Sequence, residues 1–207
     1  MPDMDVAVRP ATPADPADAL LYVSAKPYYD AYAGSEERAR ALLSAVYGRR
    51  GHAASYDVCA IAEVGGEVAG VLAAFPVSEG DQRARRFVRL TVPRLPPWRW
   101  PALLRHLRAA GLVSPHPPQR TLYVDALAVD PAFRRRGVAR ALLAHAERRA
   151  AGDGLAGVSL DTGVHNAPAR ALYAAAGYRE REVRHAPNDV VARAIGGPGF
   201  VSYVKTV

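Results

Sequence analysis

The chain has 207 residues, of which 50% are hydrophobic, and its formal net charge is +7 at pH 7. This length suits one domain with a full core, and no apolar run approaches the ~20 residues of a membrane-spanning helix. A single cysteine, Cys59, excludes an internal disulfide framework and a cysteine-rich metal site. The N-terminal residues MPDMDVAVRP lack the apolar stretch of a signal peptide, so we expect a cytoplasmic protein.

The first part of the chain predicts a strand followed by a helix. Residues 6–9 alternate between apolar and other side chains, which favours a strand. Thr12 or Asp15 is then expected to cap a helix that runs to about Ala25, with a proline tolerated in its first turn.

A second helix and a β-hairpin are expected next. The helix begins at Ser35 and ends near Gly48. Its apolar side is expected to consist of Ala41, Leu42, Ala45 and Val46. Residues 58–64 and 67–77 flank Gly65-Gly66, a pair of glycines that predicts a tight hairpin turn.

Residues 79–120 form an unusually long and basic connection, which we interpret as an insertion in a single domain. The segment carries nine arginines against two acidic residues, and this excess equals the net charge of the whole chain. Residues 86–92 are expected to extend a strand, and residues 100–110 to form a short helix that Gly111 stops. Trp98 and Trp100 either line a binding site or fix this segment to the core.

The central stretch predicts a strand, a tight basic turn and a helix. Residues 122–129 read as a buried strand that Asp130-Pro131 ends, because proline has no N–H for a ladder. Residues 134–139 form a turn around Gly137 that leads into a helix. The first N–H groups of a helix lack internal partners and lie at the positive end of its dipole, so this turn is expected to bind an anion.

The last third of the chain predicts another strand, a short helix and two closing strands. The strand covers residues 157–161, and the helix covers residues 168–176 with Gly177 at its C-terminal cap. Residues 182–185 and 200–204 are expected to be antiparallel strands joined by a loop rich in proline and glycine.

Two motifs in this framework resemble those of a known family. Arg134-x-x-Gly137-x-Ala139, after a strand that ends in Leu-Ala-Val, resembles the acetyl-CoA signature of the GNAT N-acetyltransferase superfamily, Arg/Gln-x-x-Gly-x-Gly/Ala. Downstream, Asn166-x-x-Ala-x-x-Leu-Tyr173-x-x-x-Gly-Tyr resembles the second motif of that family. The resemblance implies an α/β (α+β) fold: a single GNAT domain with a mixed, mostly antiparallel sheet and helices on both faces.

The implied activity is an acetyl-CoA-dependent N-acetyltransferase that moves an acetyl group to a primary amine of a small molecule or peptide. The amine attacks directly in a ternary complex, and neither a metal nor a covalent acetyl-enzyme is expected. The implied partners are acetyl-CoA and the amine, with no nucleic acid and no membrane, and a homodimer is left open. A catalytically silent domain that binds or senses acyl-CoA is the alternative.

The resemblance also implies which residues hold the co-substrate. Backbone N–H groups of the turn, with the arginine side chains, would bind the pyrophosphate, and the preceding strand would pair with the pantetheine arm. A backbone N–H near Leu127 or Ala128 would polarise the thioester carbonyl. The full set is Leu127, Ala128, Val129, Arg134, Arg135, Arg136, Gly137, Val138, Ala139, Arg140 and Asn166.

Asp125 and Tyr173 are the candidate catalytic residues. Alternation along the strand places Asp125 on the same face as Tyr123 and Leu127, where it is either the base for the amine or a carboxylate held by a structural partner. The family implies that Tyr173 protonates the departing sulfur, whereas the alternative is an aromatic ring packed on the sheet. An arginine-rich acceptor side would repel polycations, which favours neutral or anionic amines.

Overall fold

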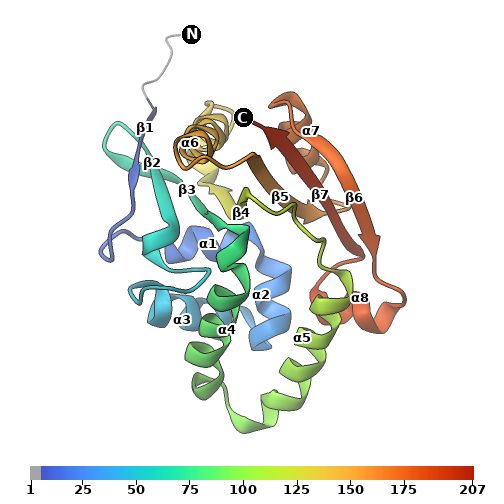
Figure 1. The fold of residues 1–207 in the computed structure, drawn as a ribbon. Helices are drawn as coiled ribbons and strands as arrows, with labels where there is room; N and C mark the ends of the chain where they lie inside the picture. Colours follow the sequence, from blue (N-terminus) through green and yellow to red (C-terminus); the bar gives the residue numbers. More distant parts are fainter. Residues whose placement is uncertain (1–5) are drawn as a thin grey trace.

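The structure, a computed structural model, describes residues 6–207, and these form a mixed sheet with helices on both faces (Figure 1). Part of the N-terminal stretch that lacks signal-peptide features, residues 1–5, lies outside this range. The strands are β1 (Val6–Pro10), β2 (Cys59–Val64), β3 (Glu67–Pro76), β4 (Thr121–Val129), β5 (Gly157–Gly163), β6 (Arg179–His185) and β7 (Gly199–Thr206). The helices are α1 (Asp18–Ser24), α2 (Lys26–Ala33), α3 (Glu36–Tyr47), α4 (Gly80–Thr91), α5 (Trp100–Val113), α6 (Val138–Gly152), α7 (Ala167–Ala175) and α8 (Asp189–Ile195).

The seven strands lie in the order β1-β2-β3-β4-β5-β7-β6. Only β4 and β5 are parallel, and every other neighbouring pair is antiparallel. Gly65 and Gly66 adopt φ values of 60° and 83° between β2 and β3, which is the left-handed backbone that a two-residue hairpin turn requires. The expected hairpin and the mostly antiparallel mixed sheet are therefore confirmed.

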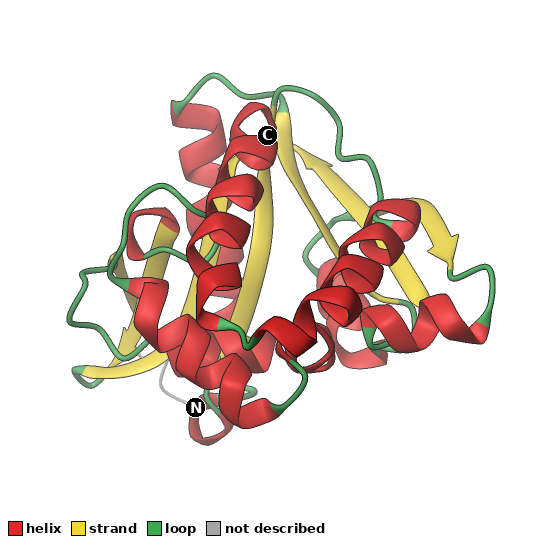
Figure 2. Ribbon diagram, turned by 90° about the horizontal axis from the view of Figure 1, so that it is seen from below, coloured by secondary structure: helices red, strands yellow, loops and turns green. Residues whose placement is uncertain are grey.

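Two layers of helices enclose the sheet. On one face α6 buries Val138, Leu142 and Ala146 against the strands, and α7 packs on the same cluster. On the other face the buried side chains of α1, α2 and α3 meet β2, β3 and β4. Viewed from below, most of the helices lie on the near side of the strands (Figure 2).

The expected cap of the first helix is wrong. Helix α1 begins at Asp18 and has no side-chain cap. Instead, the Asp15 carboxylate accepts hydrogen bonds from the Arg9 guanidinium at 2.7 and 2.9 Å and from the Thr12 N–H. This ion pair holds the segment as a turn, so the helix starts later than the sequence predicts.

The second predicted helix, α3, begins as expected, because Ser35 Oγ accepts a hydrogen bond from the Arg38 N–H at 3.3 Å. Its predicted apolar side is only half right, since Ala41 and Ala45 are exposed. The buried residues are Ala39, Leu42, Leu43, Val46 and Tyr47. The short helix α2, between α1 and α3, was not predicted.

The basic segment 79–120 is mostly helical. The expected strand at residues 86–92 is wrong, because these residues belong largely to α4, in which Arg83 pairs with Glu79, the residue just before the helix. The expected helix at residues 100–110 is confirmed as α5, although it passes through Gly111. Trp98 and Trp100 are 74% and 48% exposed, so neither ring fixes the segment to the core.

The closing part of the chain agrees with the sequence in its strands and adds one helix. Strands β6 and β7 and helix α7 lie at the expected positions. The loop between the closing strands contains α8, capped by Asn188 Oδ1, which accepts a hydrogen bond from the Val191 N–H at 3.0 Å. Among the described residues no helix is both long and apolar enough to span a membrane.

Candidate active site

Strands β4 and β5 part in the middle of the sheet. Their parallel pairing ends at Val124 and Leu160, whereas β4 continues to Val129. The Asp130 N–H donates to Ala69 O of β3 at 2.9 Å, so alternation turns the backbone N–H groups of Leu127 and Val129 away from β3. The far part of β4 thus presents backbone groups on the side where β5 has left.

A β-bulge lies at the point where the two strands part. Ala73 of β3 is paired with Ala126 and Ala74 with Val124, so Asp125 has no partner in β3. A bulge re-aims the side chain of the extra residue and resets the alternation beyond it. Tyr123 accordingly packs on the face of α1–α3 and Leu127 on the face of α6, so the prediction that Tyr123, Asp125 and Leu127 all lie on one face is wrong.

Asp125 combines solvent contact with a strongly perturbed carboxyl. Its side chain is exposed, yet protein atoms surround it closely enough that burial, followed by the charge of Asp161, raises its pKa to about 7. Exposure and desolvation coexist when a carboxylate lies low between neighbouring elements and water reaches it from one side only. A carboxyl that titrates near neutral pH is suited to take up a proton.

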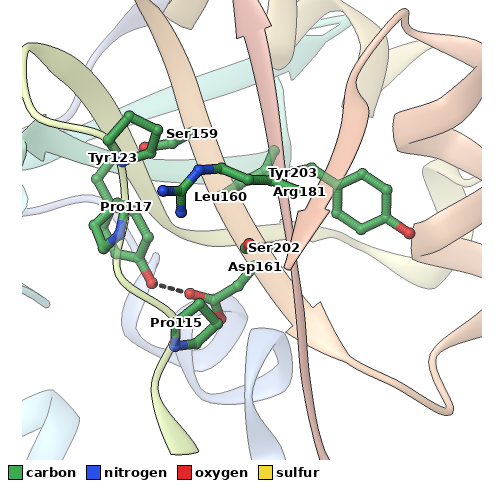
Figure 3. Close-up of a pocket in the computed structure, with 10 residues that line it drawn as sticks. Pro115, Pro117, Tyr123, Ser159, Leu160, Asp161, Arg181, Ser202 and Tyr203 are labelled. Carbon is green, nitrogen blue, oxygen red and sulfur yellow. Dashed lines mark hydrogen bonds between the residues drawn. The ribbon is translucent and has the colours of Figure 1, made fainter. Parts of the chain in front are cut away.

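Asp161 is a second carboxylate at the same place, and the sequence analysis did not identify it. It follows Leu160 in β5, and its Oδ2 accepts a hydrogen bond from the Tyr123 hydroxyl at 2.6 Å (Figure 3). Burial raises the pKa of Asp161, and the Tyr123 hydrogen bond partly opposes this. Tyr123 and Asp161 line a cavity of about 10 Å³ beside Ser159, which is about the space of one water molecule.

Two tyrosines of α2 also belong to this region. Burial, and after it the charge of Asp125, raises the pKa of the Tyr28 and Tyr29 hydroxyls. Tyr29 packs in the cluster between α1–α3 and the sheet, and the charge of Asp125 acts on its hydroxyl there. The sequence analysis missed both tyrosines because it did not predict α2, and the only local signal was Lys26-Pro27, which suits a helix start.

The basic turn after β4 leaves its backbone donors free. Gly137 is the N-cap of α6 with φ 82°, and Arg135 has φ 62°. The first helical hydrogen bond runs from the Ala141 N–H to Gly137 O at 2.9 Å, and within residues 6–207 no partner is recorded for the N–H groups of residues 138–140. A Cβ placed on Gly137 would meet nothing within 4 Å, so there is room for a ligand against the turn.

The arginines of this turn are exposed and form no ion pair with an acidic residue of the described chain. Arg134 Nε donates to Val129 O at 3.4 Å, on the open side of β4. Arg136 lies over the Phe133 ring, with its guanidinium carbon 5.7 Å from the ring centre. Within residues 6–207, the side chains of Arg135 and of Arg140 in the first turn of α6 form no hydrogen bond or ion pair. The region is therefore rich in positive charge and fits a diphosphate.

Tyr173 projects from α7 into the aromatic cluster on the other face of the sheet. Its ring lies 5.5 Å from Tyr203 and 6.2 Å from Tyr178. Burial first, and then the charge of Asp161, raises the pKa of its hydroxyl. Within residues 6–207, the Tyr178 hydroxyl is buried and has no hydrogen-bond partner. The Tyr173 hydroxyl also forms no hydrogen bond there, but it keeps some contact with solvent.

Asn166 caps α7. Its Oδ1 accepts from the Ala169 N–H at 3.4 Å, and its Nδ2 donates to Thr162 Oγ1 at 3.0 Å. One Nδ2 hydrogen remains for another acceptor. Among the predicted site residues, those of the turn at Gly137, the far part of β4, Asp125 and Tyr173 lie around the point where β4 and β5 separate. Asp125 and Tyr173 lie on opposite faces of the sheet there.

Comparisons with known proteins agree with this architecture. The family model described as "Acetyltransferase (GNAT) family" matches residues 21–178. A search among curated proteins finds no match. A crystal structure of an acetyltransferase superposes with a TM-score of 0.69 at 20% identity, covering 97% of this chain and 99% of the other. These structural similarities concern the fold.

Two further solved structures are similar over nearly their whole lengths. An N-acetyltransferase from Staphylococcus aureus Mu50 has a TM-score of 0.70 at 16% identity, covering 96% of this chain and 100% of the other. A GNAT family acetyltransferase from Elizabethkingia anophelis, solved with acetyl-CoA bound, has a TM-score of 0.54 at 14% identity, covering 100% of both chains.

Proposed function

The chain belongs to the GNAT acetyltransferase family, and on that premise we propose that it is an acetyl-CoA-dependent N-acetyltransferase. It moves an acetyl group to a primary amine of a small molecule or peptide, and the amine attacks the thioester directly while both substrates are bound. The observation that carries this proposal is the parting of β4 and β5 beyond Val124 and Leu160, beside a helix N-terminus whose donors are free.

The turn before α6 would hold the diphosphate of the donor. Free backbone N–H groups follow Gly137 in the first turn of α6 and lie at the positive end of its dipole. The exposed guanidinium groups of Arg134, Arg135, Arg136 and Arg140 add charge there. Hydrogen bonds from charged donors are roughly twice as strong as neutral ones, so the arginines would raise affinity and the backbone would set position.

The open part of β4 would then align the pantetheine arm and the thioester. Its backbone groups at Leu127 and Val129 face the side that β5 has left. By the same alternation the N–H of Ala128 points to β3, so Leu127 is the better donor to the thioester carbonyl. A fixed backbone donor at that carbonyl stabilises the negative charge that develops as the amine attacks.

Asp125 would take the proton of the attacking amine, directly or through a water molecule. A free alkyl amine is protonated at neutral pH, so a base is needed before or during attack. The pKa of Asp125 near 7 supports this role, because the carboxylate is then a stronger base than an ordinary aspartate. The nearby charge of Asp161 contributes to that basicity.

Tyr173 would protonate the sulfur that leaves. Its hydroxyl carries its proton at neutral pH, because burial keeps its pKa high, and no recorded hydrogen bond within the described chain ties it down. Asn166 would contact the donor through its remaining amide hydrogen, because its other groups are used in capping α7.

The acceptor is proposed to be a neutral or anionic amine, such as an amino acid, a peptide or a small metabolite. The support is the arginine excess of residues 79–120, the proposed basic insertion, because positive charge repels polycations. Release of free thiol from acetyl-CoA against a broad amine panel tests the proposal. Fastest turnover of polycationic amines would refute the acceptor class. Binding of coenzyme A without turnover of any amine would favour the alternative, a silent acyl-CoA-binding domain.

A further inference from the structure

A second and larger pocket lies away from the turn at Gly137 and from the far part of β4. It is a groove of about 470 Å³ between α5 and α8, with Ala31 of α2 also in its wall. This volume lies within the range of sites that bind small organic molecules, roughly 300 to 1,000 Å³. None of the residues assigned above to donor binding or catalysis lines it.

The charge of the groove is of one sign. Its wall contains Arg99, Arg105, Arg108 and Arg193 and no acidic residue. None of these four guanidinium groups forms an ion pair within residues 6–207. Burial, followed by repulsion from Arg38 and Arg105, lowers the pKa of Arg99. Arg105 and Arg99 therefore repel each other, and an anion bound between them would relieve that repulsion.

Two polar atoms in the wall are buried and lack a partner. The His106 side chain is 1% exposed, and its Nδ1 donates to Ala194 O at 2.6 Å, which leaves Nε2 unpaired. The Nε atom of Arg99 is also buried without a hydrogen bond. Buried polar atoms are nearly always paired in native structures, so unpaired atoms on two residues of the groove wall are unusual. Both atoms lie beneath the surface, the Arg99 Nε close to Gly34, and a negative charge in the groove would stabilise the groups that carry them.

The groove also offers apolar contacts. Leu112 of α5 and Val190 of α8 are 63% and 64% exposed, and both line it. Between the arginines the wall is otherwise formed by alanine and valine side chains. A ligand that matches this surface carries a negative group at one end and an apolar body.

We propose that the groove between α5 and α8 is a binding site for a small organic carboxylate with an apolar body. The carboxylate lies among Arg99, Arg105 and Arg193, above the buried His106, and the apolar body lies against Leu112 and Val190. Arginine forks match a carboxylate in two parallel hydrogen bonds, which gives the site its selectivity over neutral molecules of the same shape.

Protonation of His106 is expected to accompany binding. Because Nδ1 donates to a carbonyl, neutral His106 has only a lone pair at Nε2, and the negative charge of a carboxylate in the groove favours the imidazolium. The groups that face His106 are the rings of Tyr28 and Tyr32 from α2 and the guanidinium of Arg99, and Arg105, Arg108 and Arg193 share its groove. All the charged ones are positive, so the imidazolium is disfavoured until an anion arrives.

Calorimetric titration of the full chain with octanoate tests the proposal, with octanamide as the neutral match and octylammonium as the cationic match. We expect saturable 1:1 binding of octanoate alone, tighter at about pH 6 than at about pH 8 and with proton uptake. Arg105→Gln with Arg193→Gln should weaken binding by at least about tenfold. Arg85→Gln, an exposed arginine of α4 that does not line the groove, is the matched control and should change nothing.

Four results would overturn the proposal. Octanoate and octanamide could bind equally, or octanoate could fail to saturate at concentrations well above about 1 mM. Saturating coenzyme A could displace octanoate, which would place the anion at the turn before α6 instead. An acidic peptide could bind at the arginines while every small carboxylate fails. The comparison of the three octyl probes uses the unchanged protein, so it decides the question even if the double variant does not fold.

Discussion

The Tyr123 hydroxyl donates a hydrogen bond of 2.6 Å to Asp161 Oδ2, and this bond joins β4 to β5 beside the last residues that the two strands pair. By stabilising the ionised form of Asp161, the bond maintains a negative charge next to Asp125. That charge is one of the two causes that raise the pKa of Asp125 to about 7. The hydrogen bond at the end of the β4–β5 pairing therefore also supports the basicity of the proposed base.

Tyr173→Phe is expected to lower kcat by about 10²-fold or more, because general acid catalysis typically contributes that much. The dissociation constant of coenzyme A should stay nearly unchanged, since the lost hydroxyl acts only on the departing sulfur. Steady-state kinetics together with calorimetry of coenzyme A measure the two quantities.

Tyr178→Phe is the matched control for this variant. Its hydroxyl belongs to the same aromatic cluster and is sealed from solvent, so its removal should leave kcat unchanged. An unchanged kcat in Tyr173→Phe would contradict the proposed acid.

The pH dependence of kcat/KM is expected to report Asp125. Activity should rise as the pH increases through about 7, because the carboxyl must be ionised to accept a proton. Asp125→Asn should lower kcat/KM by about 10²-fold and remove this limb of the profile. Asp161→Asn should shift the limb to lower pH, because a like charge that raises the pKa of Asp125 is gone. If neither substitution changes the pH dependence of kcat/KM, water or another group is the base.

Gly137→Ala is expected to weaken the binding of coenzyme A. Its φ of 82° is unfavourable for alanine by about 1 kcal/mol, and the new methyl group would occupy space at the turn. Gly65→Ala introduces the same kind of strain in the β2–β3 turn, with equally open surroundings. Both variants should lose similar stability in thermal unfolding, and only Gly137→Ala should lose affinity. Equal affinities would show that the turn does not hold the donor.

Asp125→Asn is also expected to stabilise the fold at neutral and alkaline pH. The folded pKa of Asp125 is raised above its unfolded value, so its ionisation costs stability progressively as the pH rises from about 4 to about 7. Because the side chain has solvent contact, the gain should be only about 1 kcal/mol above pH 7 and vanish at low pH. Urea unfolding of both proteins across this range measures it, and a gain that is constant with pH would contradict the assigned shift.

The sequence predicted the strands and the two motif segments well because their signals are local. Gly65-Gly66 between alternating residues determines a hairpin, and Gly137 after Asp130-Pro131 determines a turn into a helix. Helix α4 was mistaken for a strand at residues 86–92, since Phe87 and Val88 suit a strand as well as a helix and the pairing of Glu79 with Arg83 became clear only in three dimensions.

Features that depend on how elements meet were not predictable. No local signal marks the bulge at Asp125, because it follows from the register between β3 and β4. The pairing of Tyr123 with Asp161 requires the register of β4 and β5. Helices α2 and α8 are too short for a clear periodic pattern, so Tyr28, Tyr29 and the groove beside α8 were not foreseen.

Thermal unfolding during a titration with coenzyme A tests the central claim most directly, namely that free amides around Gly137 hold a diphosphate. The melting temperature should rise with each increase in coenzyme A, corresponding to about 2.7 kcal/mol at 100 times the dissociation constant. Replacing Arg134, Arg135 and Arg136 by glutamine should reduce the rise without changing the unliganded melting temperature much. A melting temperature that stays constant at every concentration of coenzyme A would contradict the account.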